Sequence, residues 1–338
     1  MKRLVLSLTI LLAAPFVGSA QQAPLDHLPR RHGDVLPPSG RVAGAPGAMT
    51  IQQAGCRDVP AAQIRRRIVE LAVQEWAYFG FAIVDQTETE EDDGRGRRGR
   101  RPGDAQSTRV ADSIAGYWAV APGGDWILTS QNKIWNGLDG VSARWRFPWS
   151  AAFVSWVMCE SGLGAPDRFQ RAIAHHVYID QSIRARDQNA QRAAFVAYDA
   201  GEAPLAPGDL LCTARRPAYR ALADRRRQIG AGARTHCDIV VKADVATERI
   251  LAIGGNVRGT VGLKIIGTRN GGELRVENRT EAPRGRPVFA HLKLRAAPSD
   301  GDAFDTSPTI KALGCAGPAG ARRAASLAVA ADALRCTD

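Results

Sequence analysis

After its first twenty residues, the 338-residue sequence has no apolar run long enough to cross a bilayer. No cysteine directly follows that N-terminal run, so a lipoprotein anchor is not indicated, and no two cysteines have the close spacing of a zinc knuckle. The sequence also contains no internal repeat and no nucleic-acid-binding module. It therefore gives no reason to expect a metal, a cofactor or a nucleic-acid partner.

The N-terminus has the pattern of a secretory signal peptide. Two basic residues precede an apolar run over residues 4–17, and the small residues at 18–20 are typical of a cleavage site. We therefore predict a signal peptide over residues 1–20 and a soluble protein that is periplasmic or secreted. Residues 21–55 are rich in Pro, Gly and Ala without apolar periodicity, which predicts a disordered leader.

Charge and cysteine content fit an exported protein. The net charge of +11 favours anionic partners, which outside the cytoplasm are peptidoglycan or other anionic envelope polymers. A diffuse excess of arginine also fits an ordinary solvated surface. Six cysteines in an oxidising compartment indicate disulfides. We expect Cys212 to pair with Cys237, because both lie in short apolar runs that suit neighbouring strands, and Cys315 to pair with Cys336 in the tail.

Apolar periodicity predicts helices in the first part of the chain and strands in the second. Helices are expected over residues 60–79, 110–118, 167–186 and 321–334 and directly after Pro148, and strands over 210–213, 236–242, 249–253, 261–266, 273–276 and 288–294. This order is typical of an α+β domain with helices packed on an antiparallel sheet. We place that domain at residues 56–296, with a flexible charged insertion at 87–107 and a C-terminal appendage at 297–338.

Ser150 is the first candidate for a chemical role. Pro148 disfavours a helix entering from its N-terminal side and apolar residues at helical spacing follow it, so Ser150 is predicted on the first turn of a buried helix. The unpaired amides and the positive dipole end of such a helix stabilise negative charge, which suits a nucleophile. Serine is also a preferred N-cap, and simple capping is the alternative.

His236 is the candidate for a general base. It opens a predicted strand, and a histidine at a strand end can reach a groove between the sheet and a helix. A histidine held structurally by its neighbours is the alternative. Two residues are candidates for orienting the imidazole. Asp238 lies on the same strand face because side chains alternate, and Asn256 follows two glycines at the end of the next strand, where it is equally suited to a turn.

Two further features have both a structural and a functional interpretation. His176 and Asp180 are four residues apart on a predicted helix, which is compatible with metal ligation, but without a third ligand we expect packing instead. A group of tryptophans is suited either to a sugar-stacking wall or, for most of them, to the core. These are Trp118, Trp126, Trp135, Trp145, Trp149 and Trp156.

Several of these motifs resemble a known class of enzymes. The run Pro148-Trp149-Ser150-Ala151-Ala152-Phe153 resembles the nucleophile helix of CHAP-type and NlpC-type amidohydrolases, which begins with Pro-Trp-Cys-Ala. Residues 207–211 resemble their Pro-Gly-Asp strand entry, the strand that begins at His236 resembles their histidine strand, and Gly255-Asn256 resembles their third-residue segment. Over roughly residues 64–294, the set is more similar still to a bacterial family known as domain of unknown function 2272.

The resemblance implies a papain-like, CHAP-like fold that hydrolyses an amide bond, with Ser150 as nucleophile, His236 as base and Asn256 or Asp238 as the orienting residue. CHAP enzymes have cysteine where this chain has Ser150. A serine hydroxyl is far less acidic than a thiol, so His236 must act as a true general base during attack. The leading hypothesis is an exported amidase or peptidase that acts on peptidoglycan peptides. The alternative is a non-catalytic envelope-binding protein that keeps a papain-like groove.

Overall fold

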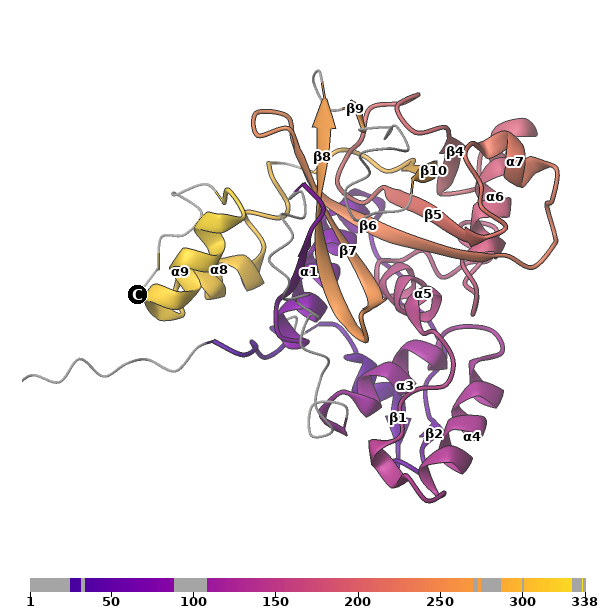
Figure 1. The fold of residues 1–338 in the computed structure, drawn as a ribbon, viewed down its shortest axis with the longest axis vertical. Coiled ribbons are helices and arrows are strands. Elements are labelled where there is room, and N and C mark those ends of the chain that lie inside the picture. Colours follow the sequence, from indigo (N-terminus) through magenta and orange to yellow (C-terminus); the bar gives the residue numbers. More distant parts are fainter. Residues whose placement is uncertain are drawn as a thin grey trace, which may run out of the picture.

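The computed structural model of the protein describes residues 25–31, 34–87, 108–269, 273–274, 287–299, 301–329 and 336. Within this part the chain has an α+β fold in which helices pack on a mixed sheet (Figure 1). The predicted signal peptide and nearly all of the predicted charged insertion at 87–107 lie outside the described residues.

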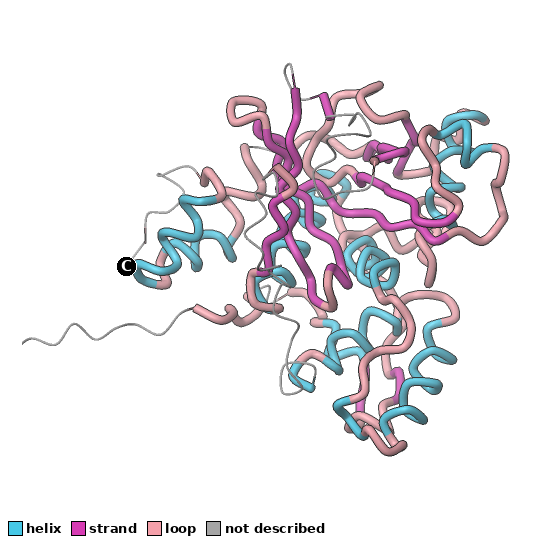
Figure 2. Tube along the Cα trace, viewed as in Figure 1, coloured by secondary structure: helices cyan, strands magenta, loops and turns pink. Residues whose placement is uncertain are grey.

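The main sheet, whose strands are magenta in Figure 2, has the strand order β3-β8-β7-β6-β5-β10-β4, and β9 pairs with the end of β8. Its strands are β3 (Ala82–Asp85), β4 (Phe195–Tyr198), β5 (Leu210–Arg216), β6 (Arg234–Asp244), β7 (Arg249–Val257), β8 (Thr260–Arg269), β9 (Glu273–Leu274) and β10 (Val288–Leu294). The pairs from β8 to β4 are antiparallel, but β3 runs parallel to β8. The prediction of a wholly antiparallel sheet is therefore wrong at this edge. A strand far earlier in the chain, with no hairpin to its partner, is free to pair in either direction.

The helices flank this sheet, and two of them support its centre. They are α1 (Ile64–Tyr78), α3 (Ala111–Ala119), α4 (Gly124–Trp135), α5 (Ser150–Glu160), α6 (His176–Asp187), α7 (Leu222–Arg226), α8 (Pro308–Gly314) and α9 (Gly317–Ser326), with 3₁₀ turns η2 (Ala61–Gln63) and η3 (Gly140–Ser142). Both α1 and α5 contact β6 and β7. Every residue of α5 is buried, so this helix packs against other parts of the protein on all of its sides. The helices predicted at 60–79, at 110–118 and after Pro148 are confirmed by α1, α3 and α5.

Two helix predictions differ from the structure. The segment predicted as helix from residue 167 becomes helical only at His176, because the backbone N–H and C=O of Ala172 both hydrogen-bond the hydroxyl of Ser155 on α5. This contact from outside the segment replaces the local helical bonds. Helix α4 is not predicted at all, since glycines and tryptophans obscure its pattern.

The leader predicted as disordered over residues 21–55 is wrong for the part from Pro38 onward, which has regular structure. A 3₁₀ turn, η1 (Pro38–Arg41), packs on α3 and leads into a hairpin of β1 (Val42–Ala43) and β2 (Thr50–Ile51). Arg41 is buried and forms an ion pair with Glu160 of α5. A buried charge is stable only with such a partner, so this pair, together with the packing of η1 on α3, holds the segment in a way that composition does not reveal.

The C-terminal segment shares the core of the domain rather than standing apart from it. Helix α8 contacts α1 and α9 packs on α8 (Figure 1), and Ile310 and Leu313 are fully buried in the main apolar cluster. The ammonium of Lys242 on β6 lies 2.9 Å from both carboxylate oxygens of Asp305 and also donates to the carbonyl of Ala328. The prediction of one Ala-rich helix over residues 321–334 is only partly right, since α9 ends at Ser326.

Three disulfides connect the described cysteines. Cys212–Cys237 joins β5 to β6 and Cys315–Cys336 closes the tail, as the sequence predicted, and Cys56–Cys159 ties the end of the leader to α5. Such bonds are consistent with a protein that resides outside the cytoplasm.

In the part of the chain that the structure describes, no helix combines the length and the apolarity that spanning a membrane requires.

Candidate active site

Ser150 is the first residue of α5, as its sequence neighbourhood predicts. The helix begins here because Trp149 takes the N-cap position and its carbonyl accepts the first helical hydrogen bond, from the amide of Phe153. The indole of Trp149 is 2% exposed and lies 5.8 Å, centroid to centroid, from the rings of both Phe79 and Tyr117. This aromatic packing, from the residue that caps the end of α1 and from α3, fixes the start of α5 and therefore the place of Ser150.

The hydroxyl of Ser150 meets the imidazole of His236. Ser150 Oγ lies 2.8 Å from His236 Nδ1, within the 2.6–3.2 Å expected between a nucleophile and its base. The serine is 5% exposed, while the side chain of His236 is 21% exposed. The capping alternative fails geometrically, because Ser150 is not at the N-cap and its hydroxyl bonds a side chain rather than a helix amide.

Asp238 completes a series of three linked side chains. His236 Nε2 lies 2.8 Å from Asp238 Oδ1, and the second carboxylate oxygen accepts a hydrogen bond of 2.6 Å from Lys264 Nζ on β8. A carboxylate only accepts hydrogen bonds, so Nε2 carries the imidazole proton and Nδ1 is left to accept from the Ser150 hydroxyl. The arrangement can therefore deprotonate the serine during attack.

The environment keeps Asp238 ionised. Burial alone would raise the pKa of this carboxyl, but the neighbouring His236 and Lys264, by charge and by hydrogen bonding, hold the pKa well below its ordinary value. The side chain is 4% exposed, so water contributes little to its solvation. Asp238 therefore stays negative at neutral pH.

Asn256, the other candidate for orienting His236, does not take that position. Among the described residues, His236 forms its hydrogen bonds to Ser150 and Asp238. Asn256 adopts a left-handed backbone conformation with φ 56° next to the tight connection between β7 and β8, which agrees with its alternative role as a turn residue. Of the two candidates, the structure places Asp238 on the imidazole.

The two glycines before Asn256 contribute more than a turn. A Cβ on Gly254 would lie 2.0 Å from Asp238 Oδ1 and 3.0 Å from His236 Nε2, so this position must lack a side chain for the two groups to meet. A Cβ on Gly255 would lie 2.6 Å from the Cβ of Phe153, so this second glycine lets α5 approach β7. The Gly-Gly pair is visible in the sequence, but neither turn chemistry nor the resemblance to CHAP-type enzymes predicts these close approaches.

His175, which no sequence pattern singles out, also lies against His236. Their ring centroids are 5.3 Å apart in an edge-to-face arrangement, and His175 is 5% exposed. His175 Nδ1 is hydrogen-bonded to the buried hydroxyl of Tyr178, and its buried Nε2 has no hydrogen-bond partner among the described residues. Burial, followed by the proximity of His236, lowers the pKa of His175 well below its ordinary value, so this second imidazole is neutral.

The pair His176 and Asp180 does not form a metal site in this arrangement. Asp180 is buried and forms a two-point ion pair with Arg225 of α7, with N–O distances of 2.6 and 2.7 Å. Its carboxylate is therefore already neutralised. Within the described ranges, no group of three or more His, Cys, Asp or Glu side chains is arranged to hold a metal ion.

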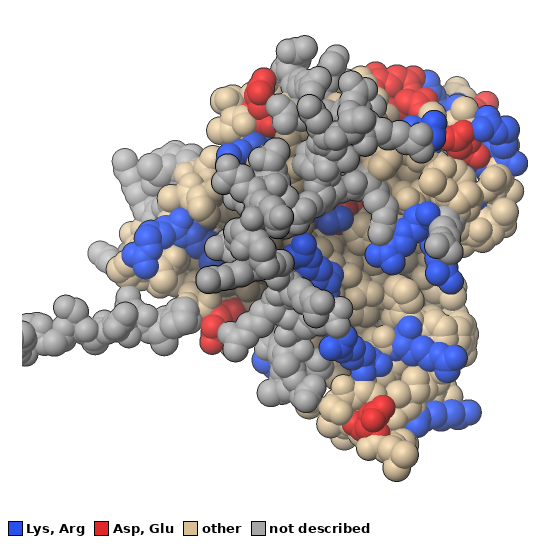
Figure 3. Space-filling model, in the orientation of Figure 1, with Lys and Arg blue, Asp and Glu red and all other residues tan. Residues whose placement is uncertain are grey.

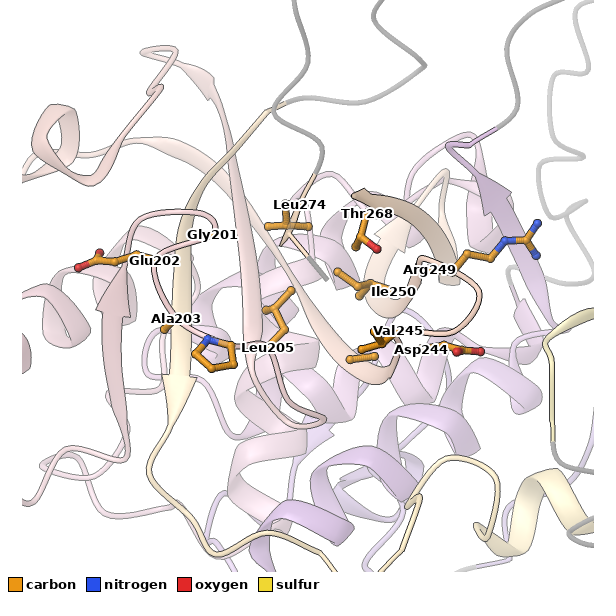
Figure 4. A pocket seen from close by; sticks show the side chains of 12 residues that line it. Gly201, Glu202, Ala203, Leu205, Asp244, Val245, Arg249, Ile250, Thr268 and Leu274 are labelled. Carbon is orange, nitrogen blue, oxygen red and sulfur yellow. The ribbon is translucent and has the colours of Figure 1, made fainter. Parts of the chain in front are cut away.

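A cavity of about 240 Å³ lies away from these residues (Figure 4). Its lining includes Leu205, Ile250, Leu274 and the turn between β6 and β7. That turn is at the C-terminal end of β6, whereas His236 is near the N-terminal end of the same strand. The cavity is therefore separate from the serine and histidine.

Fold and site together define an α+β protein in which a serine, a histidine and an aspartate are hydrogen-bonded in series. The model of a family described as "Uncharacterized protein conserved in bacteria (DUF2272)" matches residues 108–294, more than half of the chain, so the chain belongs to this family. The matched region contains Ser150, His175, His236, Asp238 and Lys264. No curated protein and no solved structure matches the chain.

Proposed function

We propose that this protein is an exported hydrolase that cleaves amide bonds in the peptide part of peptidoglycan, with Ser150 as its nucleophile and a papain-like fold. The observation that carries the proposal is the unbroken series from Ser150 Oγ through His236 to Asp238, with both links at 2.8 Å. A serine whose hydroxyl faces the free nitrogen of an oriented histidine has the components of acyl transfer.

The first half-reaction transfers the acyl group to the protein. Ser150 Oγ attacks the carbonyl carbon while its proton passes to His236 Nδ1, and Asp238 stabilises the imidazolium through Nε2–H. The oxyanion that forms is stabilised by the backbone amide of Ser150, since amides of a first helical turn have no helical acceptor. The C–N bond then breaks, and His236 gives its proton to the departing amine.

The second half-reaction releases the acid and restores the serine. A water molecule attacks the acyl-Ser150 ester while His236 Nδ1 takes one of its protons. The C–O bond to Ser150 breaks, and the proton on His236 returns to Ser150 Oγ. Amide and water are consumed, and a carboxylic acid and an amine are formed. No cofactor enters this balance.

The choice of peptidoglycan rests on charge and location. The chain carries a net charge of +11, and its lysines and arginines are spread over the face seen in Figure 3 rather than gathered in one patch. A dispersed positive surface favours an extended anionic polymer. The disulfides and the predicted signal peptide agree with action in the cell envelope, where the wall is the abundant substrate with amide bonds.

The test is hydrolysis of purified muropeptides by the wild-type protein, Ser150→Ala and His236→Ala. New amino groups, detected chemically and by mass spectrometry, are expected with the wild type alone. Ser142→Ala, at an exposed serine close in sequence, is the matched control and should remain active. If the wild type is inert, or Ser150→Ala is equally active, the proposal is wrong. Saturable binding to sacculi without cleavage would instead support an envelope-binding protein.

A further inference from the structure

Beside the candidate active site, the structure exposes an aromatic surface that none of the contacts above uses. Trp126 on α4 is 47% exposed, and its ring contacts that of Phe147 edge to face at a centroid distance of 4.9 Å. By contrast, Trp118, Trp135, Trp149 and Trp156 are buried. A half-exposed tryptophan held by a second ring presents an indole face for binding rather than for the core.

Local structure places Trp126 next to Ile173. Gly123 has a φ of 85°, which favours glycine, and it directly precedes α4. A Cβ on Gly123 would lie 3.3 Å from Trp126 Nε1 and 3.8 Å from Ile173 Cδ1, so the indole and Ile173 flank the same point. We call Trp126, Phe147 and Ile173 the aromatic ledge.

The ledge adjoins both halves of the serine–histidine pair. Phe147 is three residues before Ser150, so their Cα atoms are at most about 11 Å apart on a fully extended chain. Ile173 is two residues before His175, whose ring lies 5.3 Å from that of His236. The ledge thus combines Trp126 of α4 with the two segments that lead into Ser150 and into His175. A substrate bound at the serine would extend across it.

The positive charge beside the ledge favours ligands that combine an apolar face with a negatively charged group. The guanidinium of Arg146 lies 5.8 Å from the centroid of the Phe147 ring, and both Arg144 and Arg146 are exposed. Between Gly140 and Ser150 the chain has no acidic residue, and the two arginines outnumber the exposed carboxylate of Asp125, which precedes Trp126 in the chain. Cationic side chains beside an aromatic face suit a ring that carries a negatively charged substituent.

We propose that the aromatic ledge is a carbohydrate subsite, which binds a sugar ring bearing a carboxylate substituent. The ring stacks its C–H face on the indole of Trp126, and the carboxylate pairs with Arg146. This inference rests on the proposed function for its polymer, and it adds that the glycan as well as the peptide is recognised. Because the lactyl carboxylate of muramic acid is free only where no stem peptide is attached, the sugar at the ledge is one from which the peptide has been removed.

The experiment measures binding in Ser150→Ala protein, so that it does not depend on hydrolysis. Two disaccharides serve as probes: N-acetylglucosaminyl-N-acetylmuramic acid, and N,N′-diacetylchitobiose, which lacks the lactyl carboxylate. Ligand-observed NMR titration should give tighter binding of the acidic disaccharide. Trp126→Ala should weaken its binding about tenfold, equivalent to roughly 1.4 kcal/mol, whereas Trp126→Tyr should largely retain it. Arg146→Gln should remove the preference between the two probes.

Leu138→Ala is the matched control, since Leu138 is a fully exposed apolar residue outside the ledge. It should bind both disaccharides as Ser150→Ala does. The carbohydrate subsite is overturned if neither disaccharide binds, if Trp126→Ala binds like its parent, or if Leu138→Ala loses as much affinity. A dependence on Trp126 for the free stem peptide alone would also overturn it, in favour of a peptide subsite. Loss of hydrolysis with retained, Trp126-dependent sugar binding would contradict the proposed function and not the subsite.

Discussion

Gly254 and Asp238 approach each other so closely that a methyl group on the glycine would lie 2.0 Å from the Oδ1 atom of the carboxylate. That oxygen is the one that holds His236 at 2.8 Å. The absence of a side chain on β7 is therefore a condition for the histidine–aspartate contact on β6. A glycine without any chemistry of its own thus shapes the site.

Gly254→Ala is expected to destabilise the protein and to disrupt the site together. Overpacking of this kind costs about 1–3 kcal/mol in the free energy of unfolding, and relief of the clash must displace Asp238 or His236. Urea unfolding and muropeptide hydrolysis measure the two effects. Gly232→Ala is the control, since a Cβ there meets no atom within 4 Å. Normal activity in Gly254→Ala would show that the close approach is unimportant.

Asp238→Asn should change how stability depends on pH. The folded-state pKa of Asp238 lies below the value near 3.9 expected in the unfolded chain, so its contribution is complete above that value and is lost as the pH falls through the folded-state pKa. The wild type should therefore be more stable than Asp238→Asn at pH 7, and the difference should shrink toward pH 2. Chemical denaturation across this range measures it. A constant difference would contradict the account.

His175→Phe should reduce kcat about tenfold with little change in KM, since the ring positions His236 without touching the substrate. Acid sensitivity is a second measurement. The folded protein keeps His175 neutral, so the unfolded state gains a proton below about pH 6.5 that the folded state does not, and stability falls. Between pH 7 and 5, His175→Phe should lose less stability than the wild type. An unchanged kcat would remove His175 from the site.

The disulfide between Cys212 and Cys237 should matter for both stability and activity. Cys237 lies between His236 and Asp238, and its bond to β5 restrains the strand that carries them. Replacing both cysteines with alanine should cost about 2–4 kcal/mol of unfolding free energy and lower kcat. The matched variant, with Cys315 and Cys336 replaced, should lose stability and keep its kcat. Equal kcat in the two variants would contradict a role for the strand restraint.

Much of the fold can be predicted from periodicity in the sequence. The predictions that fail do so for specific physical reasons. Helix α5 and strands β5 to β8 are predictable because buried apolar positions recur at the period of each element. The regular structure between residues 38 and 51 is not predictable, because it depends on tertiary contacts, among them the ion pair between Arg41 and Glu160, more than a hundred residues later. The same holds for the late start of α6, which Ser155 imposes from another helix.

The residues of the candidate site likewise divide into those that the sequence predicts and those that only the tertiary fold reveals. The positions of Ser150 and His236 could be predicted from a helix start and a strand start, and i, i+2 alternation placed Asp238 beside the histidine. Lys264 and His175 could not be, because each reaches the site from an element whose neighbours only the tertiary fold determines. The choice between Asp238 and Asn256 likewise needed the path of β7.

The most direct test of the central claim is whether the Ser150 hydroxyl is a nucleophile activated by His236. A fluorophosphonate probe reacts when a serine oxygen attacks phosphorus, fluoride leaves and the hydroxyl proton passes to the base. Intact-mass and peptide mass spectrometry should find one adduct, on Ser150, in the wild type. Ser150→Ala should give none, and His236→Ala should react at least about a hundredfold more slowly, the lower end of the general-base contribution. An unlabelled wild-type protein, or labelling that persists in Ser150→Ala, would contradict the account.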